Sequence, residues 1–196
     1  YMEARDGAPT PRIVETPSGL LNAIGLQGVG VRAFVQDVLP RLAKHDVALL
    51  VNVCGDSVEE YAEVSRVCDG APGVAGLEVN ISCPNVEDRG LVFACDPVAS
   101  ATVVQGVRRN TAPGVPVFAK LSPDVTDIVQ VARAAVDAGA DGLSMINTLL
   151  GVVIDTTTML PHLAGITGGL SGPAIRPVAV RAVWQVHRAM PDVPII

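Results

Sequence analysis

The chain has 196 residues, of which 49% are hydrophobic and 17% charged, a composition typical of a globular protein with a sizeable core. Its net charge of −6 argues against a nucleic-acid surface and against binding to an anionic membrane. No uncharged apolar run is long enough for a membrane span, and residues 3–6 (Glu-Ala-Arg-Asp) do not open a signal peptide. We therefore expect a cytoplasmic protein.

Helical and strand patterns alternate along the chain. In order, they predict a helix at 30–44, a strand at 46–53, a helix at 57–68, a strand at 75–82, a helix at 97–109, a strand at 115–121, a helix at 125–138, a strand at 142–147, a helix at 174–189 and a strand at 193–196. In the helix at 125–138, Thr126 or Asp124 is expected to cap the start and Gly139 to close the end. This alternation predicts parallel βαβ units.

Both an open doubly wound sheet and a (β/α)₈ barrel fit the alternation. Polar residues end four successive strands: Asn52, Asn80–Cys83, Lys120–Ser122 and Asn147–Thr148. Four strands that bring polar groups to one rim favour the barrel, because a doubly wound sheet concentrates its site at one switch point. A full barrel needs roughly 250 residues. We therefore interpret residues 1–196 as an incomplete TIM barrel of about five strands, with N- and C-terminal parts missing.

The segment 77–86 (Leu-Glu-Val-Asn-Ile-Ser-Cys-Pro-Asn-Val) is the most informative in the chain. An alternating apolar strand stops at Cys83-Pro84, where proline cannot continue a ladder. A thiol there can act as base or nucleophile if its pKa is lowered. The alternative is a buried structural cysteine. Asn80 and Asn85, which offer both donors and acceptors, favour the functional interpretation.

Other candidate residues have a structural alternative. Lys120, inside an apolar strand, faces either an electron-rich ring or anion, or solvent with its stem packed on the barrel. Asn22, Asn52 and Asn147 are either ligand contacts or turn formers. The segment 167–177, with three glycines, either cradles a cofactor or is a flexible loop. No dinucleotide-binding G-x-G-x-x-G motif occurs.

Cysteine and histidine spacing gives no metal site. The residues concerned are Cys54, Cys68, Cys83 and Cys95, which form no C-x-x-C pair, and the scattered His45, His162 and His187. We expect reduced thiols and no metal.

Several sequence segments resemble those of the class 1 dihydroorotate dehydrogenases, in the family's order and spacing. They are Asn22-Ala-Ile-Gly-Leu26, Asn80-Ile-Ser-Cys-Pro-Asn85, Lys120-Leu-Ser-Pro123, Ile146-Asn-Thr148 and Gly168-Gly-Leu-Ser-Gly-Pro173. The residues in these segments are most similar to those of the subclass that pairs with an iron–sulfur flavoprotein (class 1B). The resemblance implies an FMN-containing barrel that oxidises dihydroorotate to orotate in pyrimidine biosynthesis.

The resemblance also implies roles for single residues. Cys83 would be the catalytic base. The substrate contacts would be Asn22, Ala23, Ile24, Gly25, Leu26, Asn80, Asn85, Asn147 and Thr148, and the FMN contacts Asn52, Asn80, Lys120, Ile146 and Gly172. A homodimer and a partner subunit carrying FAD and a 2Fe–2S cluster are implied as well. The family's lysine upstream of residue 1 and its later phosphate-binding loops are absent, so we expect the chain alone to be inactive and to bind FMN poorly.

Two other interpretations remain at this point. One is the pyrimidine-reducing domain of dihydropyrimidine dehydrogenases, which resembles this barrel and shares the cysteine motif. The other is a non-catalytic barrel fragment that binds a partner chain. Flavin in the purified full-length protein would exclude the latter.

Overall fold

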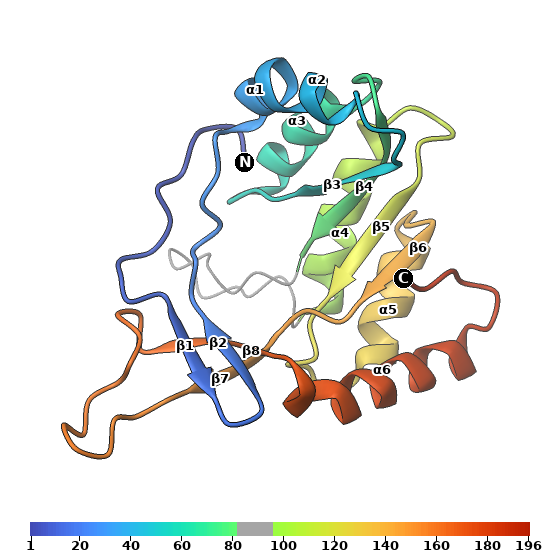
Figure 1. Cartoon of the computed structure of the whole chain (residues 1–196). Helices are drawn as coiled ribbons and strands as arrows, with labels where there is room; N and C mark the ends of the chain where they lie inside the picture. The colour runs from blue at the N-terminus through green and yellow to red at the C-terminus, as the bar shows by residue number, and fades with distance from the viewer. Residues whose placement is uncertain (82–95) are drawn as a thin grey trace.

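Residues 1–81 and 96–196 are described by the computed structural model, and they form two four-stranded sheets (Figure 1). The first sheet is parallel, with the strand order β3-β4-β5-β6. Its strands are β3 (Leu49–Val53), β4 (Val74–Asn80), β5 (Val117–Leu121) and β6 (Gly142–Met145). Four of the five expected strands are thus confirmed, while the fifth is a single parallel bridge between Ile195 and Leu143.

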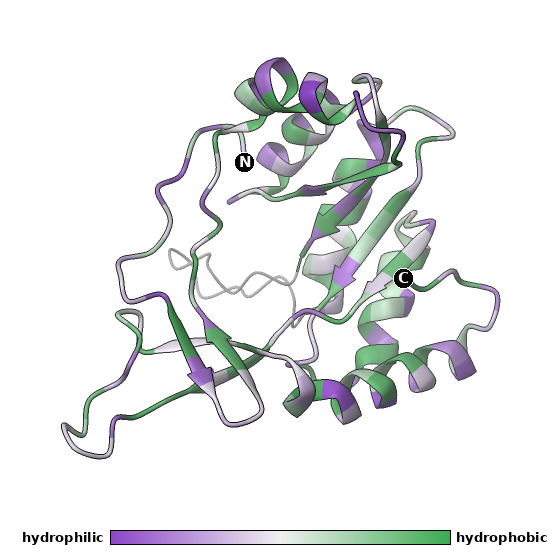
Figure 2. Cartoon of the chain, in the orientation of Figure 1, coloured by the Kyte–Doolittle hydropathy of each residue, from purple (hydrophilic) through white to green (hydrophobic). Residues whose placement is uncertain are grey.

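Helices lie between and after the strands, as the alternation predicts. They are α3 (Val58–Cys68), α4 (Pro97–Arg109), α5 (Ile128–Asp137) and α6 (Arg176–Ala189). The helix expected at 30–44 is built from α1 (Val31–Ala33), a π-helical turn (Phe34–Val38) and α2 (Leu39–Leu42). Figure 2 shows hydrophobic and hydrophilic residues alternating along α6, which is typical of a helix with one buried face. Within the described ranges, none of the helices has the length and apolarity needed to cross a membrane.

The start of α5 differs from the expectation. Asp127 is its N-cap, and the carboxylate accepts hydrogen bonds from the backbone N–H groups of Val129 (3.0 Å) and Gln130 (3.2 Å). The predicted caps Thr126 and Asp124 were therefore wrong. At the other end Gly139 has a φ of +109°, which confirms the predicted close of the helix.

The parallel sheet has one apolar and one polar face. Residues that alternate along β4, β5 and β6 are fully buried in a core shared with α3, α4, α5 and α6; they are Leu77, Val79, Val117, Ala119, Leu121 and Leu143. Residues between them point to the opposite face, because side chains along a strand alternate. That second face carries Glu78, Asn80, Lys120 and Ser144.

A second, antiparallel sheet was not predicted. It has the order β1-β2-β8-β7, formed by β1 (Ile13–Thr16), β2 (Gly19–Asn22), β7 (Leu149–Val152) and β8 (Thr167–Ser171). The glycine-rich segment 167–177 is thus not a flexible loop, since it supplies β8, a 3₁₀ turn (Pro173–Ile175) and the start of α6. In this sheet Asn22 lies opposite Gly169.

Candidate active site

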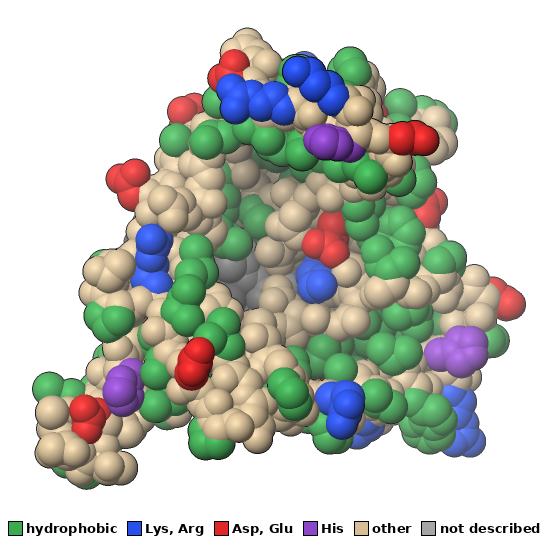
Figure 3. All heavy atoms as spheres, in the orientation of Figure 1, with side chains coloured by type: hydrophobic (Ala, Val, Ile, Leu, Met, Phe, Trp, Pro, Cys, Tyr) green, Lys and Arg blue, Asp and Glu red, His purple; other side chains and the backbone are tan. Residues whose placement is uncertain are grey.

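Strand register brings five polar side chains together on the polar face of the parallel sheet. Asn52 of β3 lies opposite Glu78 of β4, while Asn80 of β4 lies opposite Lys120 of β5, and Lys120 opposite Ser144 of β6. Figure 3 shows this face of the molecule hollowed beside the parallel sheet, with acidic and basic side chains meeting over β4 and β5. The face is therefore a polar surface built on rigid strands.

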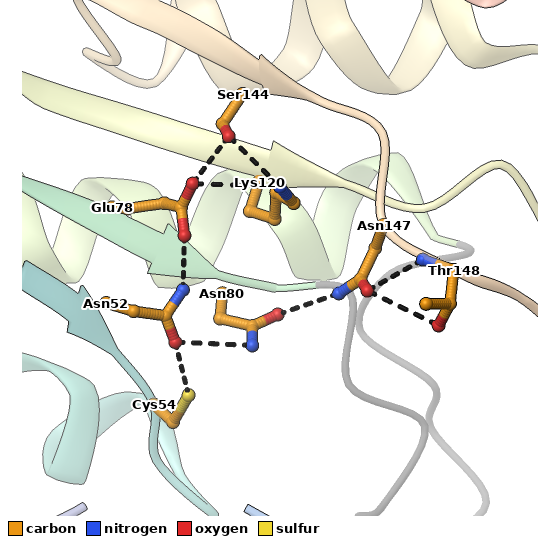
Figure 4. A network of polar contacts seen from close by, with 8 residues as sticks. All are labelled: Asn52, Cys54, Glu78, Asn80, Lys120, Ser144, Asn147 and Thr148. Carbon is orange, nitrogen blue, oxygen red and sulfur yellow. Dashed lines mark hydrogen bonds and ion pairs between the residues drawn. The ribbon is translucent and has the colours of Figure 1, made fainter. Parts of the chain in front are cut away.

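Glu78 lies at the centre of this group (Figure 4). Its carboxylate accepts hydrogen bonds from Asn52 Nδ2 and from Ser144 Oγ (2.5 Å), and Lys120 Nζ lies 3.8 Å from Oε1. Lys120 also donates to Ser144 Oγ at 3.2 Å. Both charged side chains are largely enclosed, with exposed fractions of 17% for Glu78 and 24% for Lys120. Lys120 thus meets partners on the sheet, which argues against the solvent-facing alternative.

The carboxamides continue the group towards β7. Asn80 Nδ2 donates to Asn52 Oδ1 (3.4 Å), and Asn147 Nδ2 donates to Asn80 Oδ1 (3.5 Å). Asn147 Oδ1 then accepts from the backbone N–H of Thr148 at 2.7 Å. Five of the residues singled out from the sequence therefore lie in one network: Asn52, Asn80, Lys120, Asn147 and Thr148.

Other packing holds the strand ends in place. The buried Tyr61 hydroxyl of α3 donates to the backbone carbonyl of Asn80 at 2.7 Å. Cys54 Sγ donates to Asn52 Oδ1 at 3.3 Å. Ile146 packs against the core beside the network. These contacts fix the polar side chains by anchoring the backbone that carries them.

The segment 22–26 lies against the N-terminal residues. Asn22 Nδ2 donates to the carbonyl of Gly169 (3.3 Å), and backbone groups of Ala23 and Ile24 bond to segment 8–12. Gly25 has a φ of +76°, and a Cβ there would lie 2.5 Å from the backbone nitrogen of Ala8. The backbone therefore approaches closely at Gly25. Leu26, also at positive φ, borders a cavity of about 580 Å³.

That cavity adjoins the network at Asn52 and Cys54. Its other walls come from N-terminal residues, from segment 27–30 and from apolar residues of α1, the π-helical turn, α2 and β3, among them Phe34, Val38 and Leu50. Within residues 1–81 and 96–196, no strand pairs with the edge of β3 that faces away from β4. The cavity therefore runs along an open sheet edge.

The antiparallel sheet contacts Thr148, which lies in the connection between β6 and β7. A methyl group at Gly169 of β8 would collide with Thr148 Oγ1, so the absence of a side chain there allows the contact. Gly172, at a φ of +93°, packs instead against the turn before β2, where its Cβ would lie 3.0 Å from Gly19 Cα. The expected FMN contact Gly172 is thus placed at the antiparallel sheet.

Some expectations fall outside the described residues: Cys83, Asn85 and Cys95 lie in segment 82–95. Of the other cysteines, Cys68 is fully buried in α3, and burial raises its pKa to about 11. This thiol stays protonated at neutral pH, so it is unsuited to act as a base.

Glu78 and Ser144 were missed in the sequence. A signal was present for Glu78, because period-two alternation places it on the same face as Asn80, and a carboxylate inside an apolar strand needs partners. Ser144 gave no such signal, since serine is tolerated in many strand positions.

Comparison with known proteins identifies the family. A family model described as dihydroorotate dehydrogenase matches residues 2–196. The chain belongs to the dihydroorotate dehydrogenase family. Members of this family are (β/α)₈ barrels, so the parallel sheet and its helices form a portion of one, and the fold class is confirmed.

Curated members of the dihydroorotate dehydrogenase family match along the whole chain. Proteins named "Dihydroorotate dehydrogenase B (NAD(+)), catalytic subunit" are 55% identical in Desulforudis audaxviator and 58% identical in Geotalea daltonii, over 195 residues each. A third, in Pelobacter propionicus, is 56% identical over 195 residues. These matches cover all of this chain but 62% to 63% of the relatives' length. The chain thus spans less than two thirds of the relatives it matches.

Proposed function

We propose that this chain forms the flavin- and pyrimidine-binding portion of an enzyme that oxidises (S)-dihydroorotate to orotate in de novo pyrimidine (UMP) biosynthesis. The network of Figure 4 carries this proposal. It joins residues expected to contact FMN (Asn52, Lys120) with residues expected to hold the pyrimidine (Asn147, Thr148), through Asn80, which is expected to contact both. Hydride transfer needs the two rings in contact, and such adjacency supports that geometry.

The donor set on this face suits FMN. Asn52 and Asn80 offer carboxamide donors and acceptors to the imide edge of a flavin ring. Lys120 presents an ammonium group from a rigid strand, where it can stabilise negative charge on a reduced flavin. Ile146 and Gly172 are the remaining proposed FMN contacts. When bound, FMN would supply the acceptor for the hydride from C6 of dihydroorotate.

The pyrimidine is proposed to be held by carboxamides and by the segment that precedes α1. The proposed contacts are Asn22, Ala23, Ile24, Gly25, Leu26, Asn80, Asn85, Asn147 and Thr148. Side-chain amides of this kind recognise an imide edge by paired hydrogen bonds. Cys83 is the proposed base, whose thiolate takes the proton from C5 of dihydroorotate.

The partners follow from the relatives' names. Those relatives are NAD(+)-linked catalytic subunits, so we propose an electron-transfer subunit that carries FAD and a 2Fe–2S cluster and passes electrons to NAD⁺ rather than fumarate. We also propose a homodimer in the cytoplasm. Exposed apolar side chains on the β7–β8 hairpin support a covered surface there; they are Leu150, Val152, Ile154, Met159, Leu160 and Ile166.

We propose further that residues 1–196 are part of a longer barrel. The coverage of 62% of a relative supports this, as does the outer edge of β3, which pairs with no strand among the residues that the structure describes. Open edges of aliphatic strands invite pairing with other chains. Residues 1–196 expressed alone should therefore aggregate and stay colourless with added FMN. A soluble monomer that binds FMN with micromolar affinity would contradict the proposal.

The test of function uses the full-length protein that carries this sequence. We expect it to purify with FMN and its oxidised flavin absorbance to be bleached by dihydroorotate under anaerobic conditions. Dihydrouracil is the matched control substrate and should leave the flavin oxidised. Bleaching by dihydrouracil alone would favour a dihydropyrimidine dehydrogenase-like activity, and a protein without flavin would favour a non-catalytic role.

A further inference from the structure

Three carboxamides and one carboxylate form a continuous chain of hydrogen bonds across the site (Figure 4). From one end to the other its members are Glu78, Asn52, Asn80, Asn147 and the backbone N–H of Thr148. At each step the Nδ2 of one asparagine donates to the oxygen of the preceding residue. The chain therefore has a direction.

The two ends determine that direction. A carboxylate can only accept, so Asn52 must turn Nδ2 towards Glu78 and present Oδ1 to Asn80. A backbone N–H can only donate, so Asn147 must turn Oδ1 towards Thr148. Both ends require the same orientation of the amides between them. A carboxamide otherwise rotates between two nearly isosteric states, because its oxygen and nitrogen differ little in size.

Glu78 is itself held in place from the other side. Ser144 Oγ donates to Oε1 at 2.5 Å and receives a hydrogen bond from Lys120 Nζ at 3.2 Å. The Lys120 ammonium, 3.8 Å away, compensates the charge of a carboxylate that is only 17% exposed. The carboxylate thus has a defined position from which to orient Asn52.

We propose that Glu78 is a positioning residue that sets, through Asn52, the orientation of the Asn80 and Asn147 carboxamides. This inference rests on the proposed function in one respect, namely that the Asn80 and Asn147 amides hold the pyrimidine. Glu78 touches neither of them directly. If Asn52 reversed, its Nδ2 would face the Nδ2 of Asn80, and Asn80 would have to reverse as well to restore the hydrogen bond. The reversed carboxamides would present donors where the pyrimidine needs acceptors, and the reverse, which disfavours its binding.

The first test measures orotate affinity in the full-length protein by the shift of the flavin spectrum. Glu78→Gln keeps the shape but adds an N–H donor, so Asn52 can reverse, and we expect orotate to bind about tenfold more weakly. Glu63→Gln is the matched control, because Glu63 on α3 forms a surface pair with Arg66 and should leave the affinity unchanged.

A double variant separates orientation from simple packing. In Glu78→Gln with Asn52→Asp, the new carboxylate at 52 can only accept, so Asn80 must again turn Nδ2 towards it, while the glutamine donates to it from 78. Asn52→Asp alone places two carboxylates together and should weaken binding. We expect the two substitutions to be coupled, so that the double variant binds orotate about tenfold more tightly than Asn52→Asp alone, which loss of packing would not produce. Should Glu78→Gln alone not fold, a folded double variant that binds orotate no more tightly than Asn52→Asp overturns the proposal.

The second readout does not depend on activity. With ¹⁵N-labelled asparagine, the side-chain amide resonances of Asn80 and Asn147 should move in Glu78→Gln and return in the double variant. Unchanged resonances in Glu78→Gln would overturn the proposal whatever the activity. If the resonances move but wild-type protein does not oxidise dihydroorotate, the proposed function fails while the orienting role of Glu78 stands.

Discussion

The parallel and the antiparallel sheet differ in how far apart along the chain their most distant paired strands lie. In the parallel sheet each strand pairs with the next one in sequence, across one helix. In the antiparallel sheet β2 pairs with β8, and the hydrogen bond from Asn22 to Gly169 spans 147 positions. The parallel sheet carries the expected flavin contacts Asn52, Asn80 and Lys120, and the antiparallel sheet carries Asn22 and adjoins Thr148.

This division suggests different roles for the two regions. Groups at the ends of the parallel strands are held by buried neighbours on rigid elements, which suits residues that take part in the chemical step. The antiparallel sheet carries Asn22 and contacts Thr148, both proposed to hold the pyrimidine, so it suits a role in binding. Substitutions in the two regions should therefore change different kinetic quantities.

The largest effect is expected at Cys83, which follows β4 in the sequence. Cys83→Ser in the full-length protein should retain FMN but slow flavin reduction by dihydroorotate by roughly 10²–10⁴-fold at pH 7, because a hydroxyl is far less acidic than a thiol. Stopped-flow absorbance measures the rate. Cys68→Ala is the control, and a Cys83→Ser enzyme that reduces flavin as fast as this control would remove the thiol from the mechanism.

The contact between Gly169 of β8 and Thr148 of the β6–β7 connection should be sensitive to a single methyl group. Gly169→Ala would drive a Cβ into Thr148 Oγ1 and should lower the free energy of unfolding by about 3 kcal/mol, with weaker orotate binding. Chemical denaturation measures the first quantity.

Gly165→Ala is a matched control on the same hairpin. Its Cβ would come no nearer than 3.9 Å to the Thr167 carbonyl oxygen, so we expect a change within about 0.5 kcal/mol. Equal losses at the two glycines would mean that the Gly169–Thr148 contact is not special.

A smaller effect is expected from one carboxamide. Asn147→Ala leaves Asn80 and the Thr148 N–H without a partner they have in the network, and should weaken orotate binding by about 2 kcal/mol. The flavin absorbance shift measures this affinity. Asn110→Ala, at the end of α4, should leave it unaltered. Unchanged orotate affinity in Asn147→Ala would exclude this side chain from the pyrimidine site.

The smallest effect concerns pH and the packed side of the parallel sheet. Burial raises the pKa of Cys68 to about 11 from 9.0, so the folded protein keeps this proton where the unfolded chain loses it. The contribution of this thiol to the free energy of unfolding is fully present below pH 9 and is lost as the pH rises towards 11. Between pH 8 and pH 10 the free energy of unfolding, measured by chemical denaturation, should fall by about 1 kcal/mol more in the wild type than in Cys68→Ala. Parallel pH profiles of the two proteins would contradict a buried thiol at this position.

The sequence predicted the parallel sheet and missed the antiparallel one. Apolar runs between helical patterns predict strands β3 to β6. The polar residues at the ends of these runs are the site candidates Asn52, Asn80, Lys120 and Asn147. No helix separates β1 from β2 or β7 from β8, so the alternation of strands and helices does not reveal them, and β8 also contains two glycines.

The misses within the predicted region have local causes. Asp124 and Asp127 are equally good caps by residue type, and tertiary contacts decide between them, because Asp124 accepts from the backbone N–H of Leu150. Glu78 was overlooked because its partners Asn52 and Ser144 come from two other strands. The register between strands decides which of these side chains lie opposite one another, and no local sequence pattern predicts that register.

The pairing of β2 with β8 has a consequence for the order in which the molecule folds. Each βα unit of the parallel sheet can close over a short stretch of chain, whereas the antiparallel sheet requires closure of a loop of 147 residues. Pairings between distant segments form slowly, since chain entropy must be overcome before they are stabilised. During synthesis on the ribosome the rim of the parallel sheet can therefore assemble first. Strand β2 can pair with β1 early, whereas the bond from Asn22 to Gly169 forms only after residue 169 has emerged.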